Sequence, residues 1–295
     1  MHEIKAKSIL SAGKNGMNIY RGCLHGCIYC DARSACYQMD HSFEDIAVKA
    51  NAPELLEDAL RRKRHRCMIG TGAMSDPYIP LESNLCLTRK CLELIDRYGY
   101  GLAIQTKSDL ILRDLDLLKS INSKTKCVVQ MTLTTFDENL CRIIEPNVCA
   151  TKRRFEVLKI MRDEGIPTVV WMTPILPFIN DTEENIRGLL DLCIEAKVYG
   201  IVLWGIGVTL REGDREYFYE QLDIHFPGVK EKYIRNYGNA YEIPSPDQER
   251  LMKIVREECG KHGISCNASG IFSYMSRFED KTSGKQMSLT DYIEQ

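Results

Sequence analysis

The chain has 295 residues, of which 44% are hydrophobic and 27% charged, and 39 basic against 41 acidic residues give a net charge of −2. This composition is typical of a globular protein with a sizeable core and excludes an intrinsically disordered chain. The near-zero charge also excludes a general electrostatic attraction to nucleic acid, although a local basic patch can still exist.

The N-terminus and the apolar segments indicate a cytoplasmic protein without membrane association. The first five residues, MHEIK, do not begin a signal peptide. The longest apolar stretch, 166–179, is interrupted by Thr173, Pro174 and Pro177 and is too short to cross a bilayer. The thirteen cysteines are odd in number and scattered, which favours reduced thiols over a disulfide framework. We expect most of them to pack in the core.

Short β-rich runs alternate with amphipathic helical stretches along most of the chain, and helices are expected at 85–98 and 184–196. The strand-like runs lack apolar/polar alternation, as parallel strands covered on both faces do. The alternation predicts an α/β fold, a partial (β/α)6 TIM-like barrel with its chemistry at the carboxyl ends of the strands. The expected strands are 18–20, 67–71, 102–106, 127–133, 168–172 and 201–205.

The C-terminal part fits this alternation less well. A helical run covers 248–259, and 263–266 reads as one more strand. We therefore expect a barrel core over 1–225 and a C-terminal extension over 226–295 that packs on the barrel or covers its opening.

Three closely spaced cysteines, Cys23, Cys27 and Cys30, follow the first expected strand and so lie at the catalytic rim. Thiolates at such spacing select iron–sulfur clusters or zinc. A four-iron cluster needs one ligand for each iron, so three protein ligands leave one iron open for a substrate or cofactor. The alternatives are zinc, with His25 or Cys36 as fourth ligand, and cysteines that merely pack in the core.

The Cx3Cx2C spacing, with Tyr29 just before the third cysteine, resembles the radical S-adenosylmethionine (SAM) superfamily. The resemblance implies a [4Fe–4S] cluster on Cys23, Cys27 and Cys30 whose open iron chelates SAM, and an external one-electron reductant similar to flavodoxin or ferredoxin. It also implies cleavage of SAM to a 5′-deoxyadenosyl radical that abstracts hydrogen from a substrate. In this family the aromatic at Tyr29 packs near the adenine; a buried core tyrosine is the alternative.

From about residue 15 to residue 207 the chain resembles the spore photoproduct lyase-like branch of that superfamily. The resemblance implies SAM contacts at the carboxyl ends of successive strands. Each of these residues also has an ordinary structural explanation, such as the turn that an Asp-Pro pair opens. The implied contacts are Ser75 and Asp76 toward the methionine moiety, Lys107 on its carboxylate, Thr132 and Thr134 toward the ribose or methionine, and Met172 and Gly205 toward the adenine and substrate.

Two positions depart from the lyase. Its hydrogen-donating thiol, just before the Ser-Asp pair, corresponds to Ala73, and the tyrosine after its third cysteine corresponds to Asp31. Neither residue can supply a hydrogen atom or relay a radical. We therefore expect the residues that bind and cleave SAM to be intact and those that face the substrate to differ from the lyase. The sequence does not name the substrate, and a nucleic acid is one candidate.

Two basic clusters invite a nucleic-acid interpretation. The run 61–66 closes a helix on the barrel face opposite the three cysteines, where cations compensate the helix dipole. The cluster 152–154 opens a helix, where cations are unfavourable, so a partner or an anionic substrate is one explanation. A nucleic-acid-interacting protein, like a zinc-binding module without redox chemistry, is thus an alternative to the enzyme.

Overall fold

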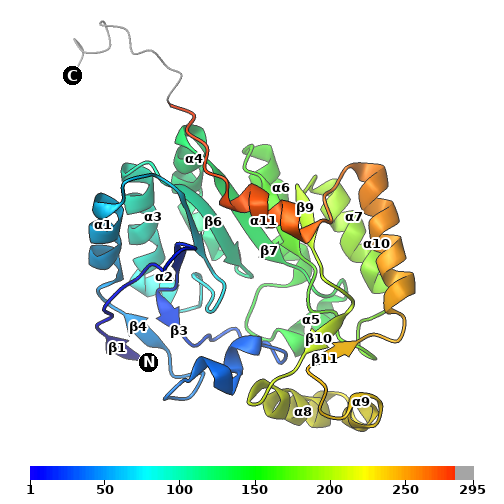
Figure 1. Cartoon of the computed structure of the whole chain (residues 1–295). Helices are drawn as coiled ribbons and strands as arrows, with labels where there is room; N and C mark the ends of the chain where they lie inside the picture. Colours follow the sequence, from blue (N-terminus) through cyan, green and yellow to red (C-terminus); the bar gives the residue numbers. More distant parts are fainter. Residues whose placement is uncertain (283–295) are drawn as a thin grey trace, which may run out of the picture.

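Six parallel strands form the central sheet of the molecule, which the computed structural model describes over residues 1–282 (Figure 1). The strand order is β2-β5-β6-β7-β8-β9, and every neighbouring pair runs parallel. The predicted partial (β/α)6 barrel is confirmed. The strands of this sheet are β2 Gly16–Met17, β5 Met68–Thr71, β6 Gly101–Thr106, β7 Cys127–Thr132, β8 Thr168–Trp171 and β9 Gly200–Val202.

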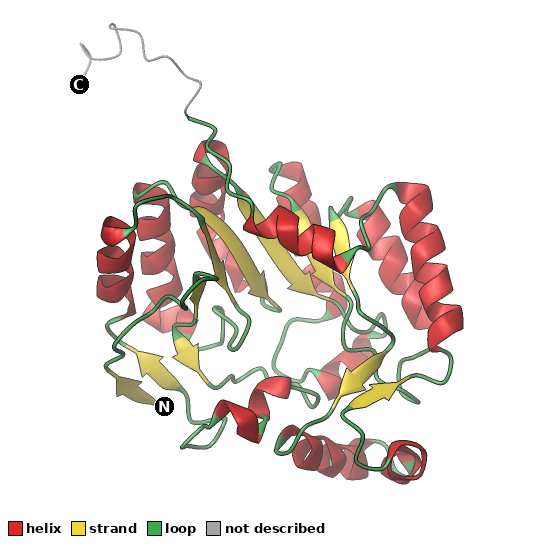
Figure 2. Ribbon diagram, viewed as in Figure 1, coloured by secondary structure: helices red, strands yellow, loops and turns green. Residues whose placement is uncertain are grey.

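Helices cover the outer face of this sheet (Figure 2). The predicted helices 85–98 and 184–196 correspond to α3 and α7. In α3 the periodic residues Cys91, Leu92 and Ile95 are fully buried, as an amphipathic helix on a sheet requires. The helices of the barrel are α1 Ala52–Arg62, α2 Glu82–Leu85, α3 Leu87–Arg97, α4 Leu115–Lys124, α5 Glu138–Ile144, α6 Thr151–Asp163 and α7 Glu183–Glu195, with short 3-10 helices at Asp31–Arg33, Ala35–Tyr37 and Asp109–Asp114.

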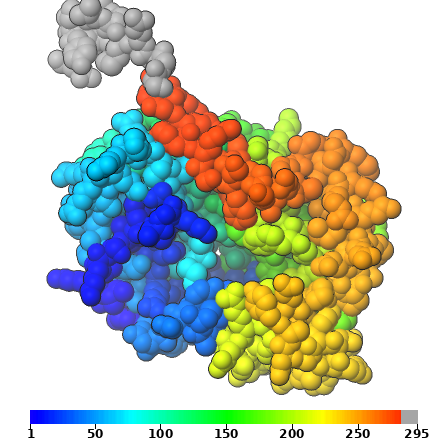
Figure 3. All heavy atoms as spheres, in the orientation of Figure 1, coloured from blue at the N-terminus to red at the C-terminus, as the bar shows by residue number. Residues whose placement is uncertain are grey.

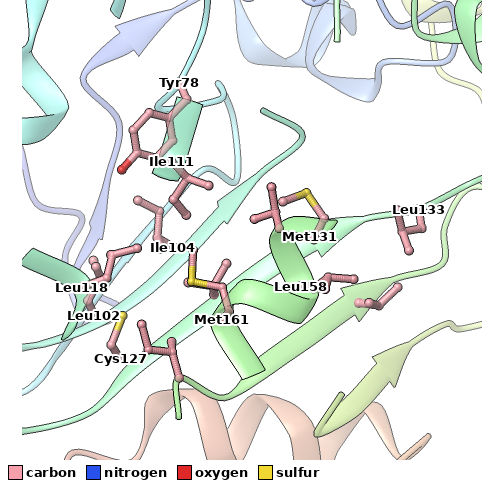
Figure 4. Packing of buried hydrophobic residues seen from close by; sticks show 14 of the residues in the cluster. Tyr78, Leu102, Ile104, Ile111, Leu118, Cys127, Met131, Leu133, Leu158 and Met161 are labelled. Carbon is pink, nitrogen blue, oxygen red and sulfur yellow. The ribbon is translucent and has the colours of Figure 1, made fainter. Parts of the chain in front are cut away.

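The two faces of the sheet bury different sets of side chains. On the outer face, residues such as Leu102, Ile104 and Met131 pack with the surrounding helices in the main core (Figure 4). On the inner face, a smaller cluster joins one residue from each of β5 to β9 to Ile271 and Met275 of α11 (Ala268–Ser276). The C-terminal helix therefore covers part of the concave side of the sheet, which it crosses in Figure 1.

The first expected strand, 18–20, is wrong. The barrel strand β2 ends at Met17, and Tyr20 begins β3 (Tyr20–Arg21), which pairs antiparallel with β4 (Ala47–Lys49). With β1 (His2–Ile4), these strands form a separate three-stranded sheet in the order β1-β4-β3. The reason is a tertiary contact: the Tyr20 side chain is buried and donates a hydrogen bond to Glu82, so the chain leaves the barrel sheet before the cysteines.

The C-terminal extension contains helices and one short strand, while 263–266 contributes only a single bridge, Ser265 to Gly200. Strand β11 (Glu242–Pro244) pairs antiparallel with β10 (Gly207–Thr209), which follows β9. The expected helix 248–259 is α10, Gln248–His262. Helix α9, Val229–Tyr237, also belongs to the extension, whereas α8, Asp214–His225, is the last helix of the predicted core. The division at residue 225 stays a prediction, and residues 283–295 of the extension lie outside the described residues.

The structure also bears on the membrane and cysteine predictions. Among residues 1–282, every helix is too short or too polar to cross a bilayer. All thirteen cysteines are free. Arg61 and Arg62 of the basic run occupy the last turn of α1, as predicted, and form ion pairs with Glu57 and Asp58 of the same helix.

Candidate active site

A cavity of about 880 Å³ opens at the carboxyl ends of the barrel strands. This volume lies in the upper part of the 300–1,000 Å³ range of small-molecule sites. Its walls come from the segments that follow β5, β6, β7, β8 and β9, together with the segment 23–32 and the β10–β11 pair. In the space-filling view the molecule is hollowed at its centre, between the N-terminal segments and the β10–β11 region (Figure 3). The cavity therefore lies where such barrels have their active sites, at the carboxyl ends of the strands.

The three predicted cluster cysteines line this cavity together. Cys23 and Cys27 are buried and Cys30 is half-buried. Burial raises the pKa of all three thiols, whereas the nearby Lys107 ammonium lowers that of Cys27 and Cys30. Since metal ligation requires thiolates, the sulfurs need positive charge beside them. Lys107 supplies part of it, and a metal bound by the three sulfurs would supply the rest.

Asp76 organises the segment after β5. Its carboxylate accepts hydrogen bonds from the Thr106 hydroxyl and the Lys107 amide, both at 2.7 Å, and its Oδ2 lies 3.0 Å from Nε2 of His25. Burial alone would raise the pKa of Asp76, but His25 and these hydrogen bonds lower it below its ordinary value. The carboxylate therefore joins the loop after β6 to the cysteine segment. Ser75 acts similarly, donating to the Gly22 carbonyl at 2.6 Å.

Lys107 is a cation without a counter-ion. Its ammonium lines the cavity 5.9 Å from the Tyr29 ring centroid and makes no ion pair or hydrogen bond with any residue of 1–282. Burial lowers the pKa of Lys107, but electrostatic interaction with Cys27, Glu145 and Cys30 more than offsets this, so the pKa is raised. The side chain is thus a charged group free to bind an anion in the cavity.

The Tyr29 side chain is fixed by a buried ion pair between Glu145 and Arg154, which sequence analysis missed. Its hydroxyl donates to Glu145, which also pairs with Arg154, and both of these charged side chains are 0% exposed. Arg154 donates further to the carbonyls of Thr132 and Cys149. Arg154 therefore supports the residues behind the cavity and is not available to a partner or substrate, whereas Lys152 and Arg153 of the same cluster are exposed. Burial raises the pKa of Glu145, but Arg154 and Lys107 outweigh it and lower the pKa.

The segment Ile144–Asn147 supports the whole cysteine loop. The Ile144 carbonyl accepts from the Ile28 amide at 3.0 Å. The Asn147 amide donates to the His25 carbonyl at 3.1 Å, and the Asn147 side chain donates to the Leu24 carbonyl at 2.9 Å. Because these bonds grip the loop by its backbone, its shape does not depend on the cysteine side chains alone.

The other predicted contacts divide into two groups. Thr132 and Gly205 line the cavity. Thr134 does not; it is fully buried, and its carbonyl accepts from Asn180 and Asn185. Met172 does not line it either, because its side chain is fully buried in the main core. Both follow the ends of their strands, but their side chains point away from the open side.

The alternative zinc ligands are engaged elsewhere. His25 faces Asp76, and Cys36 is exposed, outside the cavity wall, where its sulfur accepts from Arg211 at 3.3 Å. Within residues 1–282, no three Cys, His, Asp or Glu side chains surround a single ion-sized point. Ligands of a four-iron cluster each bind a different iron, so they need not converge in that way.

The two departures from the lyase both lie in the wall of the cavity. Ala73 presents no transferable hydrogen. Asp31 accepts from the Tyr37 hydroxyl at 2.7 Å and pairs with Arg211 at 3.3 Å. Trp204, Arg211 and Tyr241 line the same cavity. Sequence analysis missed Tyr37 and Arg211 as cavity residues.

Comparison with known proteins identifies the family. The radical SAM superfamily model matches residues 17–193, more than half of the chain. The chain belongs to the radical SAM superfamily. An uncharacterised protein of Methanocaldococcus jannaschii is 35% identical over 251 residues, which cover 82% of this chain and 86% of that protein.

Solved structures agree with this assignment at the level of the fold. A spore photoproduct lyase variant has a TM-score of 0.63 at 14% identity and covers 88% of this chain and 78% of its own. Another, with bound AdoMet and dinucleoside spore photoproduct, has a TM-score of 0.58 at 15% identity, over 83% and 72% of the two chains. Both share the fold of this radical SAM protein.

The cofactors follow from the family. Radical SAM proteins use a [4Fe–4S] cluster and SAM, and they draw on an external one-electron reductant. The site described above fits both groups, because it presents three neighbouring thiols, one unpaired cation and a cavity large enough for a nucleotide. This radical SAM protein is therefore an enzyme.

Proposed function

We propose that this chain cleaves SAM reductively and uses the resulting radical to abstract hydrogen from a substrate other than the spore photoproduct. The observation that carries the proposal is the unpaired ammonium of Lys107 beside three thiols in one cavity. When bound, the cluster supplies one electron to the SAM sulfonium, whose C5′–S bond then breaks to give methionine and a 5′-deoxyadenosyl radical.

Each cavity residue has a proposed task. Cys23, Cys27 and Cys30 hold the cluster through their sulfurs. Lys107 binds the SAM carboxylate by a charge-assisted hydrogen bond. Tyr29, fixed by Glu145, limits the space beside the cluster.

Other predicted contacts act less directly. Both carboxylate oxygens of Asp76 are already engaged within the protein, so we assign it the positioning of Lys107 rather than contact with SAM. Ser75 holds the Gly22 carbonyl in the same way. Thr132 presents its side chain to SAM, and at Gly205 the absence of a side chain leaves room for the ligand. Thr134 and Met172 keep structural roles.

The cavity residues that would face the substrate support a reaction different from that of the lyase. In the lyase, a thiol at the position of Ala73 returns hydrogen to the product radical. Here that position of the cavity wall carries a methyl group, which cannot do so. We propose that hydrogen abstraction leaves 5′-deoxyadenosine as a product. We also retain as proposals a flavodoxin- or ferredoxin-like reductant, a cytoplasmic location and an extension from residue 226 that borders the substrate, since Tyr241 and Gln248 line the cavity.

The test is anaerobic reconstitution with iron and sulfide, followed by SAM and dithionite. We expect about four irons per chain and release of 5′-deoxyadenosine. Cys23→Ala, Cys27→Ala and Cys30→Ala should each lose both, while Cys36→Ala, a thiol outside the cavity, should lose neither. Lys107→Met should keep its iron and weaken SAM binding about 10- to 100-fold, the loss of one charge-assisted hydrogen bond.

Two results would refute the proposal. One is colourless protein that binds a single zinc. The other is iron content and deoxyadenosine release that survive any one of the three cysteine substitutions. Incubation with dinucleoside spore photoproduct, which a structural neighbour holds, tests the substrate separately. We expect no repair to thymine.

A further inference from the structure

One strand edge in the wall of the active-site cavity has no hydrogen-bond partner. Strand β10 pairs antiparallel with β11, and backbone hydrogen bonds of Ile206 and Leu210 close the two ends of this pair (Figure 1). Antiparallel strands bond through alternate residues, so Gly207 and Thr209 point their N–H and C=O groups away from β11. Within residues 1–282, no protein group bonds to these four backbone groups. We call Gly207 and Thr209 the free β10 edge.

The free β10 edge lies in the cavity, close to the cysteine segment. Gly207 and Thr209 both line the cavity. Between them, the side chain of Val208 is buried in one hydrophobic core with Cys27 and Tyr29. The strand is therefore held firmly beside the residues around which the proposed function generates its radical. A molecule bound along this edge lies inside the active site.

The opposite edge of the same two-stranded sheet is closed. Pro244 of β11 has no N–H group, and its carbonyl accepts a hydrogen bond from the hydroxyl of Tyr237, the last residue of α9. Proteins commonly block a sheet edge with proline or charged side chains, which prevents it from pairing with another chain. The free β10 edge has neither, since it consists of a glycine and a threonine. The sheet is therefore closed on the side of α9 and open in the cavity.

The spacing of the four unpaired groups matches an extended peptide. Alternate residues of a strand lie about 6.8 Å apart, and an extended peptide presents complementary C=O and N–H groups at the same interval. A nucleobase carries its hydrogen-bonding groups on one small ring system, so it can engage one residue of the edge but not both. Because β10 is already fixed by β11 and by Val208, it loses little conformational entropy when a peptide pairs with it.

We propose that the substrate is a peptide segment that binds in extended form, as a third strand against the free β10 edge. The inference deepens the proposed function and rests on it. Main-chain hydrogen bonds hold the segment in register, and its side chains alternate between the two faces of the small sheet. In the reaction, one C–H bond of the segment breaks and its hydrogen forms the C5′–H bond of 5′-deoxyadenosine, which leaves the unpaired electron on the peptide carbon.

The experiment asks which class of molecule gives hydrogen to 5′-deoxyadenosine. The reconstituted chain is incubated in ordinary water with SAM, dithionite and a digest of protein from cells grown in heavy water, so that the peptides carry deuterium on carbon. A parallel sample receives deuterated oligonucleotides instead. Mass spectrometry then measures the deuterium in the 5′-deoxyadenosine.

Two proline variants test the edge itself. Thr209→Pro removes one N–H of the free β10 edge and places a ring there, yet the fold loses no hydrogen bond, because this N–H has no partner within the described residues. The matched control is Glu3→Pro. Glu3 lies on β1 outside the cavity wall, and the pairing of β1 with β4 through His2 and Ile4 leaves the Glu3 N–H equally unpaired.

We expect deuterium from the peptides and none from the oligonucleotides. Thr209→Pro should keep its iron and still cleave SAM, but it should transfer about tenfold less deuterium, since one main-chain hydrogen bond to the peptide is lost. Glu3→Pro should match the parent. Absence of deuterium transfer from the peptides while SAM is cleaved would overturn the inference, and so would full transfer by Thr209→Pro.

Amide hydrogen exchange of residues 203–210 adds a readout without turnover. We expect the Gly207 and Thr209 amides to exchange fast both in the reconstituted chain and after addition of SAM alone. Protection by SAM alone would assign the edge to the cofactor and overturn the inference. If Thr209→Pro takes up no iron, the labelling and exchange results of the parent decide. If the parent itself takes up no iron or cleaves no SAM, the proposed function fails instead.

Discussion

Replacing Arg154 by methionine should destabilise the chain strongly. The variant keeps the apolar stem but leaves the Glu145 carboxylate, which is 0% exposed, with the Tyr29 hydroxyl, the weak Cys141 thiol donor at 3.8 Å and the more distant Lys107 to stabilise its charge. Breaking one side of a buried ion pair costs about 3–5 kcal/mol. For a chain of this size, where 1 kcal/mol shifts Tm by about 2 °C, Tm should fall by roughly 6–10 °C.

The assay is thermal unfolding of the iron-free chain by circular dichroism, so that cluster content does not contribute. Arg153→Met is the matched control, because the Arg153 side chain is 44% exposed and its pairs with Asp109 and Glu156 lie at the surface. It should change Tm by no more than about 2 °C. The double variant Arg154→Met/Glu145→Gln removes both charges, keeps an acceptor for Tyr29 and should recover at least half of the loss. Equal Tm values for Arg154→Met and Arg153→Met would refute the reasoning.

Three further outcomes are expected. Lys126→Met removes an ammonium that donates to a backbone carbonyl of α11 at 2.7 Å, so it should cost about 1–3 kcal/mol and make the C-terminal segment more sensitive to limited proteolysis; unchanged cleavage would contradict this role. Burial raises the pKa of Asp214 to about 6, so the stability conferred by its protonated form is present near pH 4 and lost as the pH rises through about 6. Asp214→Asn should therefore resist urea better than the parent at pH 7 but not at pH 4, and an equal gain at both would be a counterexample. Gly72 has φ +98°, and a Cβ there would overlap the Gln105 carbonyl, so Gly72→Ala should lower Tm markedly, whereas Gly70→Ala, which meets nothing within 4 Å, should not.

The sequence predicts the barrel well because its evidence is local. Each buried strand after the first is a continuous apolar run, and α3 and α7 have helical periodicity, so neither needs tertiary information to be recognised. The first strand fails for the opposite reason. Only the pairing of Tyr20 with Val48 and its hydrogen bond to Glu82 reveal that this segment has left the sheet.

The same distinction applies to the site. The carboxyl-end rule brings Ser75, Lys107 and Thr132 to one cavity, because it depends on chain direction alone. It does not fix how far beyond the end of a strand the side chains still face the cavity, and so it wrongly places Thr134 there. Glu145 was missed because it follows no strand and reaches Tyr29 across 116 residues of sequence.

Trp204 and Trp171 are the two tryptophans of the chain, and they meet edge to face with ring centroids 5.5 Å apart. Trp204 lines the cavity and yet is 62% exposed, so a ligand that enters there removes water from one indole while its neighbour stays packed against α11. The unlabelled protein therefore contains its own optical reporter at the entrance, and candidate substrates can be screened by the blue shift of its emission before any product is known.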